Sequence, residues 1–331
     1  NNPLGMGADR WVVTGFRDAF ESAGHKADFF TEKDNLRGKL ETFRPDIFIT
    51  NIDIFRLDPK AADHIKAAKT KGLKVLFNAG ENFLEHATRF RSLTTEGIAD
   101  MFYTTYADEV MAGFEALVGR PAILIPLAAN SKIHFPVSPD TRYAADISFI
   151  GARLKTKEHI FRNVLLPLRK KYRVDIYGPG WTTKDKILRA LSGFGRRTKL
   201  FGLADWANQK RISVPLELER VIYSSSKICL NIHEYYPEGH SKNLSNEREF
   251  KIPACGGFQI SDAVLGLERF FIPDKEIVIS RDASELISKI EYYVSHDAER
   301  EAVRKAGIER AVRFHTYDAR VVQIMDIYKT L

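Results

Sequence analysis

SNEREFKIPACGGFQISD, residues 245–262, passes from a charged helical start through a double glycine to an apolar strand. Ser245 or Asn246 is a good N-cap residue, and Glu249 stands where a capping-box partner is expected. The apolar run GFQIS (257–261) has the length of a buried strand. A short helix that leads straight into such a strand is typical of parallel α/β folds.

The two ends of this helix differ in their expected roles. Gly256 and Gly257 allow the tight turn into the strand. The charged start, with Arg248, suits a phosphate and a sugar because helix N-termini bind anions. Glu247 lies one helical turn before Lys251, so we expect the two side chains to pair on one face.

Outward from this stretch, apolar runs alternate with helical patterns, which predicts βαβ units and parallel sheets. The expected strands are DIFITNI (46–52), KVLFN (74–78), MFYTT (101–105), AILIP (122–126), DISFIG (146–151), VDIYG (174–178), KICLNI (227–232), GFQIS (257–261) and EIVIS (276–280). The expected helices cover 8–24, 59–72, 107–119, 157–172 and 283–296, and an amphipathic helix is expected within 315–331.

The bulk properties narrow the class of protein. A chain of 331 residues exceeds the usual size of one core, so two domains are expected. The net charge of +7 indicates anionic partners. The basic residues are spread among 43 acids without a nucleic-acid type block, so no nucleic acid is expected as a partner. Two distant cysteines, Cys229 and Cys255, predict small buried residues in a reducing compartment, and hence a cytoplasmic protein.

The loop after DISFIG is the first candidate binding site. Gly151 ends the strand, and Arg153, Lys155 and Lys157 follow it before a helix begins. Three cations beside a helix N-terminus suit a diphosphate. An ordinary solvated loop with surface lysines is the alternative explanation.

Two further loops follow strands in the same half of the chain. In VDIYGPGWT, Gly178 begins a sharp turn and Tyr177 stands where a ring can stack on a nucleobase or pack in the core. The strand in KICLNIHE (227–234) ends at Asn231-Ile232-His233, before a long polar loop of the kind that is often functional. A structural histidine is the alternative for His233.

DISFIG, IYGPGW, KICLNIHE, N-x-R-x-F-x-I-P-A-C-G-G-F and HTYDAR, taken in this order, resemble the CgeB-like glycosyltransferases of the GT-B class. The resemblance covers roughly residues 146–320. It implies an α/β fold with two Rossmann-like domains facing across a cleft, and a nucleotide-sugar donor held mostly by the C-terminal domain. It implies neither a metal nor a cofactor, because helix dipoles and basic side chains can neutralise the leaving diphosphate.

The expected domains are an N-terminal acceptor domain (1–142), a C-terminal donor domain (143–312) and a closing helix (313–331). The opening NNPLGMGADRW (1–11) has the character of a loop whose preceding strand is absent.

At one position the sequence departs from the resemblance. Related enzymes carry a glutamate before I-P-A-C-G-G that accepts hydrogen bonds from the ribose, and this chain has Lys251, which only donates. Three explanations are open: Glu247 or Glu249 takes the place of that glutamate, the donor is held differently, or activity has been lost. The spacing of Glu247 and Lys251 favours the first explanation, with Glu247 as the replacement. The donor-binding candidates are therefore Gly151, Arg153, Lys155, Lys157, Tyr177, Gly178, Asn231, His233, Asn246, Glu247, Arg248, Lys251, Gly256 and Gly257.

The catalytic base is sought in N-terminal loops that follow strands. Glu81 in NAGEN is the first candidate and Asp9 the second, with Asp53 in a third loop. A structural carboxylate is the alternative for each of them.

The function expected is metal-independent transfer of a sugar from a nucleotide-sugar to a glycan, lipid-linked glycan or protein acceptor, as in polysaccharide biosynthesis. A non-catalytic module that binds sugar nucleotides or glycans and a nucleotide-sugar epimerase are the alternatives. The positive charge also suits peripheral contact with the inner face of a membrane.

Overall fold

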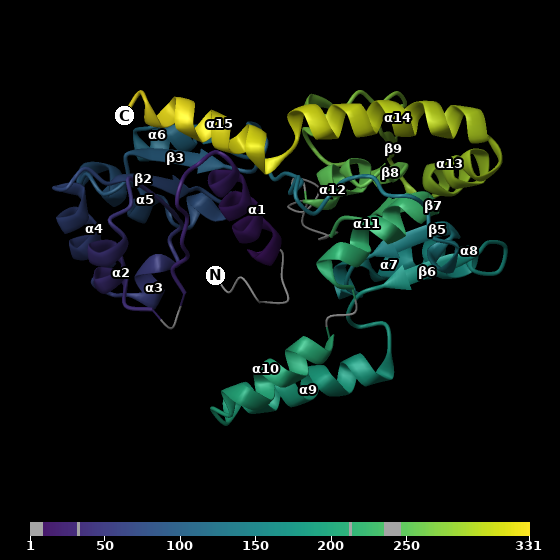
Figure 1. The fold of residues 1–331 in the computed structure, drawn as a ribbon, viewed down its shortest axis with the longest axis horizontal. Coiled ribbons are helices and arrows are strands. Elements are labelled where there is room, and N and C mark those ends of the chain that lie inside the picture. Colours follow the sequence, from purple (N-terminus) through teal and green to yellow (C-terminus); the bar gives the residue numbers. More distant parts are fainter. Residues whose placement is uncertain (1–8, 32–33, 212–213, 235–245) are drawn as a thin grey trace. The chain divides into compact units, whose positions relative to one another are not determined.

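A computed structural model describes residues 9–31, 34–211, 214–234 and 246–331. The chain forms two compact units, each with its own all-parallel sheet (Figure 1). Of the described residues, 19–127 and 318–331 form the first unit, whereas 9–18 and 128–317 form the second. The division falls inside helix α1 (Asp9–Ser22) and at the start of α15 (Tyr317–Tyr328). The expected ranges of the domains stay a prediction.

The first unit has the strand order β1-β2-β3-β4, so each strand pairs in parallel with the next one along the chain. Its core is a cluster of apolar side chains from the strands and the helices that cover them, in which Phe90, Phe102 and Phe114 pack edge to face. The strands are β1 (Ile47–Thr50), β2 (Lys74–Asn78), β3 (Met101–Thr104) and β4 (Ala122–Leu124), and the helices α2 (Leu36–Phe43), α3 (Ile54–Leu57), α4 (Ala61–Lys69), η1 (Glu81–Leu84), α5 (Ala87–Thr95) and α6 (Phe114–Val118).

The second unit has the strand order β6-β5-β7-β8-β9. The strands are β5 (Ala145–Ile150), β6 (Val174–Tyr177), β7 (Ser226–Asn231), β8 (Gln259–Asp262) and β9 (Val278–Ser280). Around them lie η2 (Thr141–Tyr143), η3 (Lys155–Lys157), α7 (Glu158–Ile160), η4 (Phe161–Leu165), α8 (Leu166–Leu168), α9 (Thr183–Arg197), α10 (Phe201–Arg211), α11 (Leu216–Ser225), α12 (Arg248–Ala254), η5 (Leu267–Arg269), α13 (Ala283–Ser295) and α14 (Asp297–Phe314).

These elements confirm the expected fold class of two parallel-sheet α/β units. All nine expected strands form within two residues of their predicted bounds, because strands covered on both faces read as continuous apolar runs. Cys229 and Cys255 are both buried and unpaired, as expected, and burial raises the pKa of the Cys229 thiol to about 12.

Helix prediction was less accurate than strand prediction. Only Phe114–Val118 of the expected helix 107–119 forms as α6, because Gly113 and Gly119 adopt positive φ at its two ends. The hairpin of α9 and α10 was not predicted at all. Within the part of the chain that the structure describes, no helix has the length and apolar character needed to cross a bilayer.

Candidate functional site

The candidate site lies at the carboxyl edge of the second sheet. β6 pairs with one side of β5 and β7 with the other, so the chain order reverses at β5. Open α/β sheets bind ligands outside the carboxyl ends of the strands at such a switch point. Gly151 follows β5 and Asn231 ends β7, so this edge carries the predicted loops.

Arg248, the first residue of α12, ties the ends of β5 and β7 together. Its Nε donates to Asn231 Oδ1 at 2.8 Å, and its terminal nitrogens donate to the carbonyl oxygens of Ile232 at 3.2 Å and Ile150 at 3.4 Å. The Asn246 amide donates to the same Asn231 oxygen at 3.1 Å. A planar guanidinium bonded in this way holds its charge at a fixed position on the carboxyl edge.

Lys157 adds a second cation beside Arg248. Its side chain is buried, and Nζ donates to the Ile232 carbonyl at 2.8 Å. Burial, together with the nearby charge of Arg248, lowers the pKa of Lys157 to about 7. We refer to Lys157, Asn231, Asn246 and Arg248 as the carboxyl-edge cluster.

The other two predicted loop cations lie outside this cluster. Arg153 pairs with Glu158 at 2.7 Å and lies over the Trp181 ring, with 5.4 Å from its guanidinium carbon to the ring centre. Lys155 is exposed. The three cations thus have different environments, although they stand within five residues.

The two glycines bring the loops after β5 and β6 together. A Cβ on Gly178, whose φ is +126°, would lie 2.3 Å from the Gly151 carbonyl oxygen. Trp181 Nε1 donates to that same oxygen at 2.9 Å. Glycine is therefore required at position 178 by the approach of the two loops. The ring of Tyr177 is partly buried beside them, and its contact with a base stays a prediction.

His233, which is buried, forms an ion-pair triad with the buried Glu249 and the partly exposed Asp262. Its Nδ1 lies 2.6 Å from Asp262 Oδ1 and its Nε2 lies 2.9 Å from Glu249 Oε1. Burial disfavours the imidazolium, but the two carboxylates outweigh it and raise the pKa of His233 to about 9. Burial raises the pKa of Glu249. His233 is thus a charged residue that joins β7, α12 and β8.

The predicted capping box at the start of α12 is wrong. The Glu249 carboxylate is buried against His233 and does not return to the helix start. Asn246 Oδ1 instead accepts from the Arg248 backbone N–H at 2.9 Å. The N-cap residue is Glu247 and not Ser245 or Asn246 as predicted, and burial of Glu249 against His233 overrode the local capping pattern.

The predicted pairing of Glu247 with Lys251 is also wrong. Lys251 Nζ lies 3.1 Å from Glu219 Oε2 in α11 and 3.9 Å from the centre of the Trp11 ring. Both charged side chains of this pair are only 4% exposed. Glu219 of α11, which is as buried as Lys251, therefore takes the place expected for Glu247. A buried ammonium needs a carboxylate at close range.

Gly256 and Gly257 lie away from the carboxyl-edge cluster. They follow the C-terminal end of α12 and precede β8, at the amino edge of the sheet. A Cβ on Gly257 would lie 2.8 Å from an Ile252 methyl carbon, and one on Gly256 would lie 3.1 Å from Pro136. The structure explains both by tight packing, and it does not bring them to the other donor-binding candidates.

The catalytic candidates can be placed only by their backbone. Asp9 begins α1 and Glu81 begins η1, directly after β2, but the side chains of both lie outside the described part of the chain. Asp53 lies at the start of α3, 3.8 Å from Arg56. The roles of these three carboxylates stay predictions.

Two charged residues of the second unit were given no role by the sequence. Asp262 is 29 residues from His233, and Glu219 is 32 residues from Lys251. No local spacing could have revealed either partner, since both pairings come from neighbouring elements of the folded sheet.

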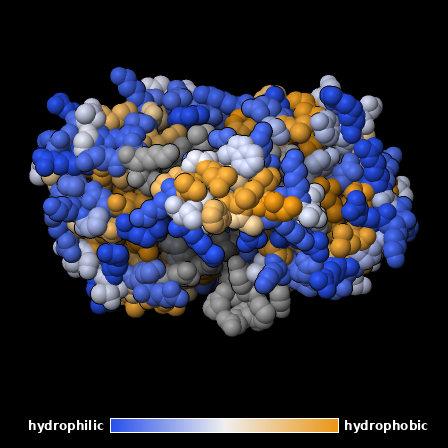
Figure 2. All heavy atoms as spheres, turned by 90° about the horizontal axis from the view of Figure 1, so that it is seen from below, coloured by the Kyte–Doolittle hydropathy of each residue, from blue (hydrophilic) through white to orange (hydrophobic). Residues whose placement is uncertain are grey.

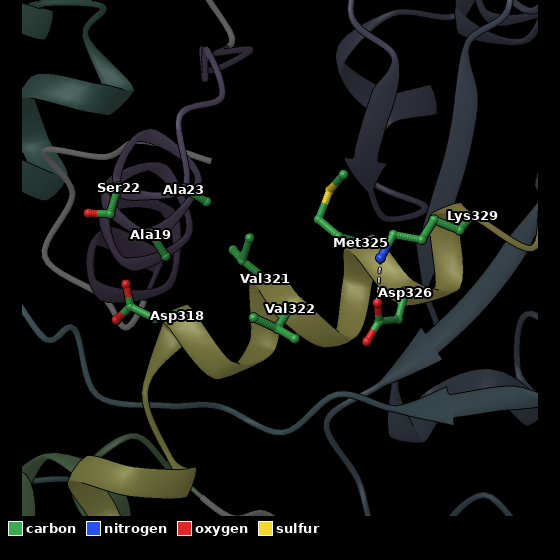
Figure 3. A pocket seen from close by; sticks show the side chains of 9 residues that line it. All are labelled: Ala19, Ser22, Ala23, Asp318, Val321, Val322, Met325, Asp326 and Lys329. Carbon is green, nitrogen blue, oxygen red and sulfur yellow. Dashed lines mark hydrogen bonds and ion pairs between the residues drawn. The ribbon is translucent and has the colours of Figure 1, made fainter.

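The first unit carries a shallow hollow between α1 and α15 (Figure 3). Ala19 in α1 and Ala23 just after it line one side of the hollow, and Val321 and Met325 of α15 line the other, with the Asp326–Lys329 ion pair at one end. It shares no residue with the candidates for donor binding.

Comparison with known proteins assigns the chain to a family. Residues 155–326 match the model of the glycosyl transferase-like family. The chain belongs to this family and is a glycosyltransferase of the GT-B class.

Individual proteins resemble the chain over nearly its whole length. The spore protein CgeB of Bacillus subtilis (strain 168) is 20% identical over 98% of this chain and 94% of its own. A glycosyltransferase from Rickettsia africae has a TM-score of 0.60 at 13% identity, over 98% of this chain and 95% of its own. Anabaena HepE, solved in complex with UDP-glucose, also has a TM-score of 0.60 at 13% identity, over 98% and 96%.

Proposed function

We propose that the chain transfers a sugar from a nucleotide-sugar donor held at the carboxyl-edge cluster, without a metal, to a glycan, lipid-linked glycan or protein acceptor. The observation that carries the proposal is the pairing of two cations, Arg248 and Lys157, at the switch point between β5 and β7. Two positive charges beside a helix N-terminus favour a diphosphate, both in the donor and as the leaving group.

The donor class is supported by the fold. HepE, whose TM-score with this chain is 0.60, was solved with UDP-glucose, so a uridine diphosphate sugar is the first donor to test. Glu247, which is buried beside Asn246 and Arg248, keeps its proposed role as an acceptor for the ribose hydroxyls. Glu81 and Asp9 remain the proposed catalytic bases.

The direct test is a thermal-shift panel of UDP, GDP, dTDP, CMP and their common sugar conjugates, with and without magnesium. A nucleotide-sugar present at about 100 times its dissociation constant stabilises the folded state by about 2.7 kcal/mol. We expect one base to be preferred and the stabilisation to be the same in EDTA. Absence of a shift with every nucleotide would contradict the proposal, and a shift that requires magnesium would contradict its metal-independence.

Turnover separates an enzyme from a binding module. We expect slow release of free sugar from the preferred donor even without an acceptor, measured by chromatography of the products. Donor binding without any release, also in the presence of candidate acceptors, would favour the module.

Arg248→Gln should weaken donor binding by about 10- to 100-fold, because a hydrogen bond to a charged group contributes about 1.5–3 kcal/mol. The matched control is Arg281→Gln, which removes the same charge just beyond β9 from a side chain that is 84% exposed. Isothermal titration of both variants with the donor measures the difference. Equal affinities for the two variants would exclude Arg248 as a donor contact.

Donor affinity should fall as the pH rises above about 7. The pKa of Lys157 is about 7, and a diphosphate bound beside it favours the charged form, so binding takes up a proton. The dissociation constant of UDP-glucose, which has no phosphate group that titrates in this range, should rise by up to about tenfold per pH unit. Lys157→Met should abolish this pH dependence, whereas Lys155→Met in the same loop should keep it.

A further inference from the structure

The α9–α10 hairpin (residues 183–211) buries mostly small side chains and exposes most of its large apolar ones. Its two helices pack mainly against each other. A Cβ on Gly195 would lie 2.9 Å from the Ala204 nitrogen, and Ser192, Ala204 and Ala207 are also buried. The inner face of the hairpin therefore holds Leu188, which is 7% exposed, but leaves most of the other large apolar side chains outside.

These outer side chains form an apolar surface. Ile187, Leu191 and Phe194 recur at the spacing of one helical stripe, with exposures of 57%, 36% and 56%. Phe201 and Trp206 of α10 are 62% and 47% exposed. Figure 2 shows an orange patch over the hairpin, bordered by blue. Of the fifteen large apolar side chains exposed in the described part of the chain, six lie in this hairpin, so the surface is not a random scatter.

The same hairpin carries nearly all the net charge of the protein. It has eight lysines and arginines against two aspartates, a net charge of +6 out of +7 for the whole chain. One of the aspartates, Asp185, is held by Arg211 at 2.8 Å. On α9, Arg189 and Arg196 are exposed and fall opposite the apolar stripe at 100° per residue. Lys186 and Arg197 are also exposed and fall on the flank of the stripe.

An apolar stripe of Leu, Ile and Phe with a Lys- and Arg-rich opposite face is the composition of helices that lie in a membrane interface. A second copy of the hairpin is a poor partner, because two surfaces of net charge +6 would repel each other. The aliphatic side chains Ile187 and Leu191 have no flat face for stacking on bases, which disfavours single-stranded nucleic acid.

We propose that the α9–α10 hairpin binds the surface of a membrane that contains anionic lipid. Ile187, Leu191, Phe194, Phe201 and Trp206 enter the boundary between headgroups and acyl chains, and the surrounding lysines and arginines contact the anionic headgroups. The hairpin would thereby hold the second unit at a bilayer, independently of whether its candidate site turns over a donor.

Flotation of the full chain with vesicles tests the proposal. Phosphatidylcholine vesicles with about 30% phosphatidylglycerol should bind at least about tenfold more tightly than phosphatidylcholine alone. About 0.5 M salt should remove most of that difference, because it screens charges over a few ångströms. Equal binding to both vesicles, or binding to neither, would overturn the proposal.

A triple variant locates the contact. Ile187→Ser, Leu191→Ser and Phe194→Ser together should lower vesicle affinity by at least about tenfold, because the whole exposed apolar stripe of α9 is lost. The matched control replaces three equally exposed apolar residues outside the hairpin, Val312, Phe314 and Val322, by serine. Equal loss in the two variants, or none in the first, would contradict the assignment. The melting temperature and the nucleotide-induced shift of each variant show that folding and the donor site are intact.

Trp206 provides a spectroscopic readout at the contact itself. Trp11 is 6% exposed and Trp181 is partly buried, whereas Trp206 is 47% exposed. Anionic vesicles should shift the tryptophan emission to the blue, and Trp206→Phe should abolish the shift. Light scattering tests whether a second copy of the chain binds this surface instead. If the protein self-associates and the triple serine variant does not, the surface is an interface between copies of the chain, and the membrane proposal is overturned.

Discussion

Replacing Lys251 by glutamate should destabilise the second unit by at least about 3–5 kcal/mol, lowering the melting temperature by about 6–20 °C. The new carboxylate would meet Glu219, whose Oε2 lies 3.1 Å from the present ammonium, at a site where both side chains are 4% exposed. Attraction between opposite charges would become repulsion between like charges, with little water to screen it. The Trp11 ring face, which now attracts the cation, would repel a carboxylate.

A charge swap distinguishes this cause from general damage. Glu219→Lys combined with Lys251→Glu restores an opposite-charge pair and should recover at least half of the lost stability in urea unfolding. His134 limits the recovery, because its Nε2–H would face the new lysine ammonium at position 219. Its Nδ1 accepts from the Asn130 N–H at 2.9 Å, which leaves the ring proton on Nε2, 3.9 Å from Glu219 Oε2. Lys305→Glu on the exposed side of α14 is the control and should change the stability by less than about 0.5 kcal/mol.

This result would also bear on the donor site. Glutamate at position 251 is what the resemblance to related transferases leads one to expect, so its introduction is an obvious attempt to create a ribose contact. The Glu219 pair predicts unfolding instead of tighter binding. Tighter nucleotide binding by Lys251→Glu at an unchanged melting temperature would contradict the buried pair.

His233→Ala should cost about 3–5 kcal/mol at pH 7, because it leaves Glu249 and Asp262 without the cation between them. Replacing Glu249 by glutamine in the same chain should recover part of the loss, since the neutral amide removes a fully buried carboxylate. Urea unfolding of the single and double variants measures both values. If the free energy of unfolding of the double variant changes by the sum of the two single changes, the two side chains do not interact.

The pH dependence of this effect has a definite sign. Folding raises the pKa of His233 from 6.5 to about 9, so its contribution to stability is fully present below pH 6.5 and is lost as the pH rises through about 9. The difference in stability between the native protein and His233→Ala should therefore shrink between about pH 6.5 and 9. A constant or growing difference would mean that His233 is neutral in the folded protein.

The sequence by itself determined the layered architecture. Nine apolar runs predicted nine strands, because strands covered on both faces must be apolar along their whole length. It also determined which loops reach the carboxyl edge, since Gly151, Tyr177 and Asn231 each stand at a strand end. Asn246 and Arg248 could be expected beside them because α12, the helix that follows β7, begins at the same edge of the sheet.

Only the tertiary structure decided which charges meet. The local rules paired Lys251 with Glu247 and gave Glu249 a capping role, whereas the fold pairs Lys251 with Glu219 and Glu249 with His233. Local rules describe contacts on a solvated helix, where a pair contributes a few tenths of a kcal/mol. In a buried layer, an unpaired charge costs several kcal/mol, so the partner is chosen by the packing of elements that are distant in sequence.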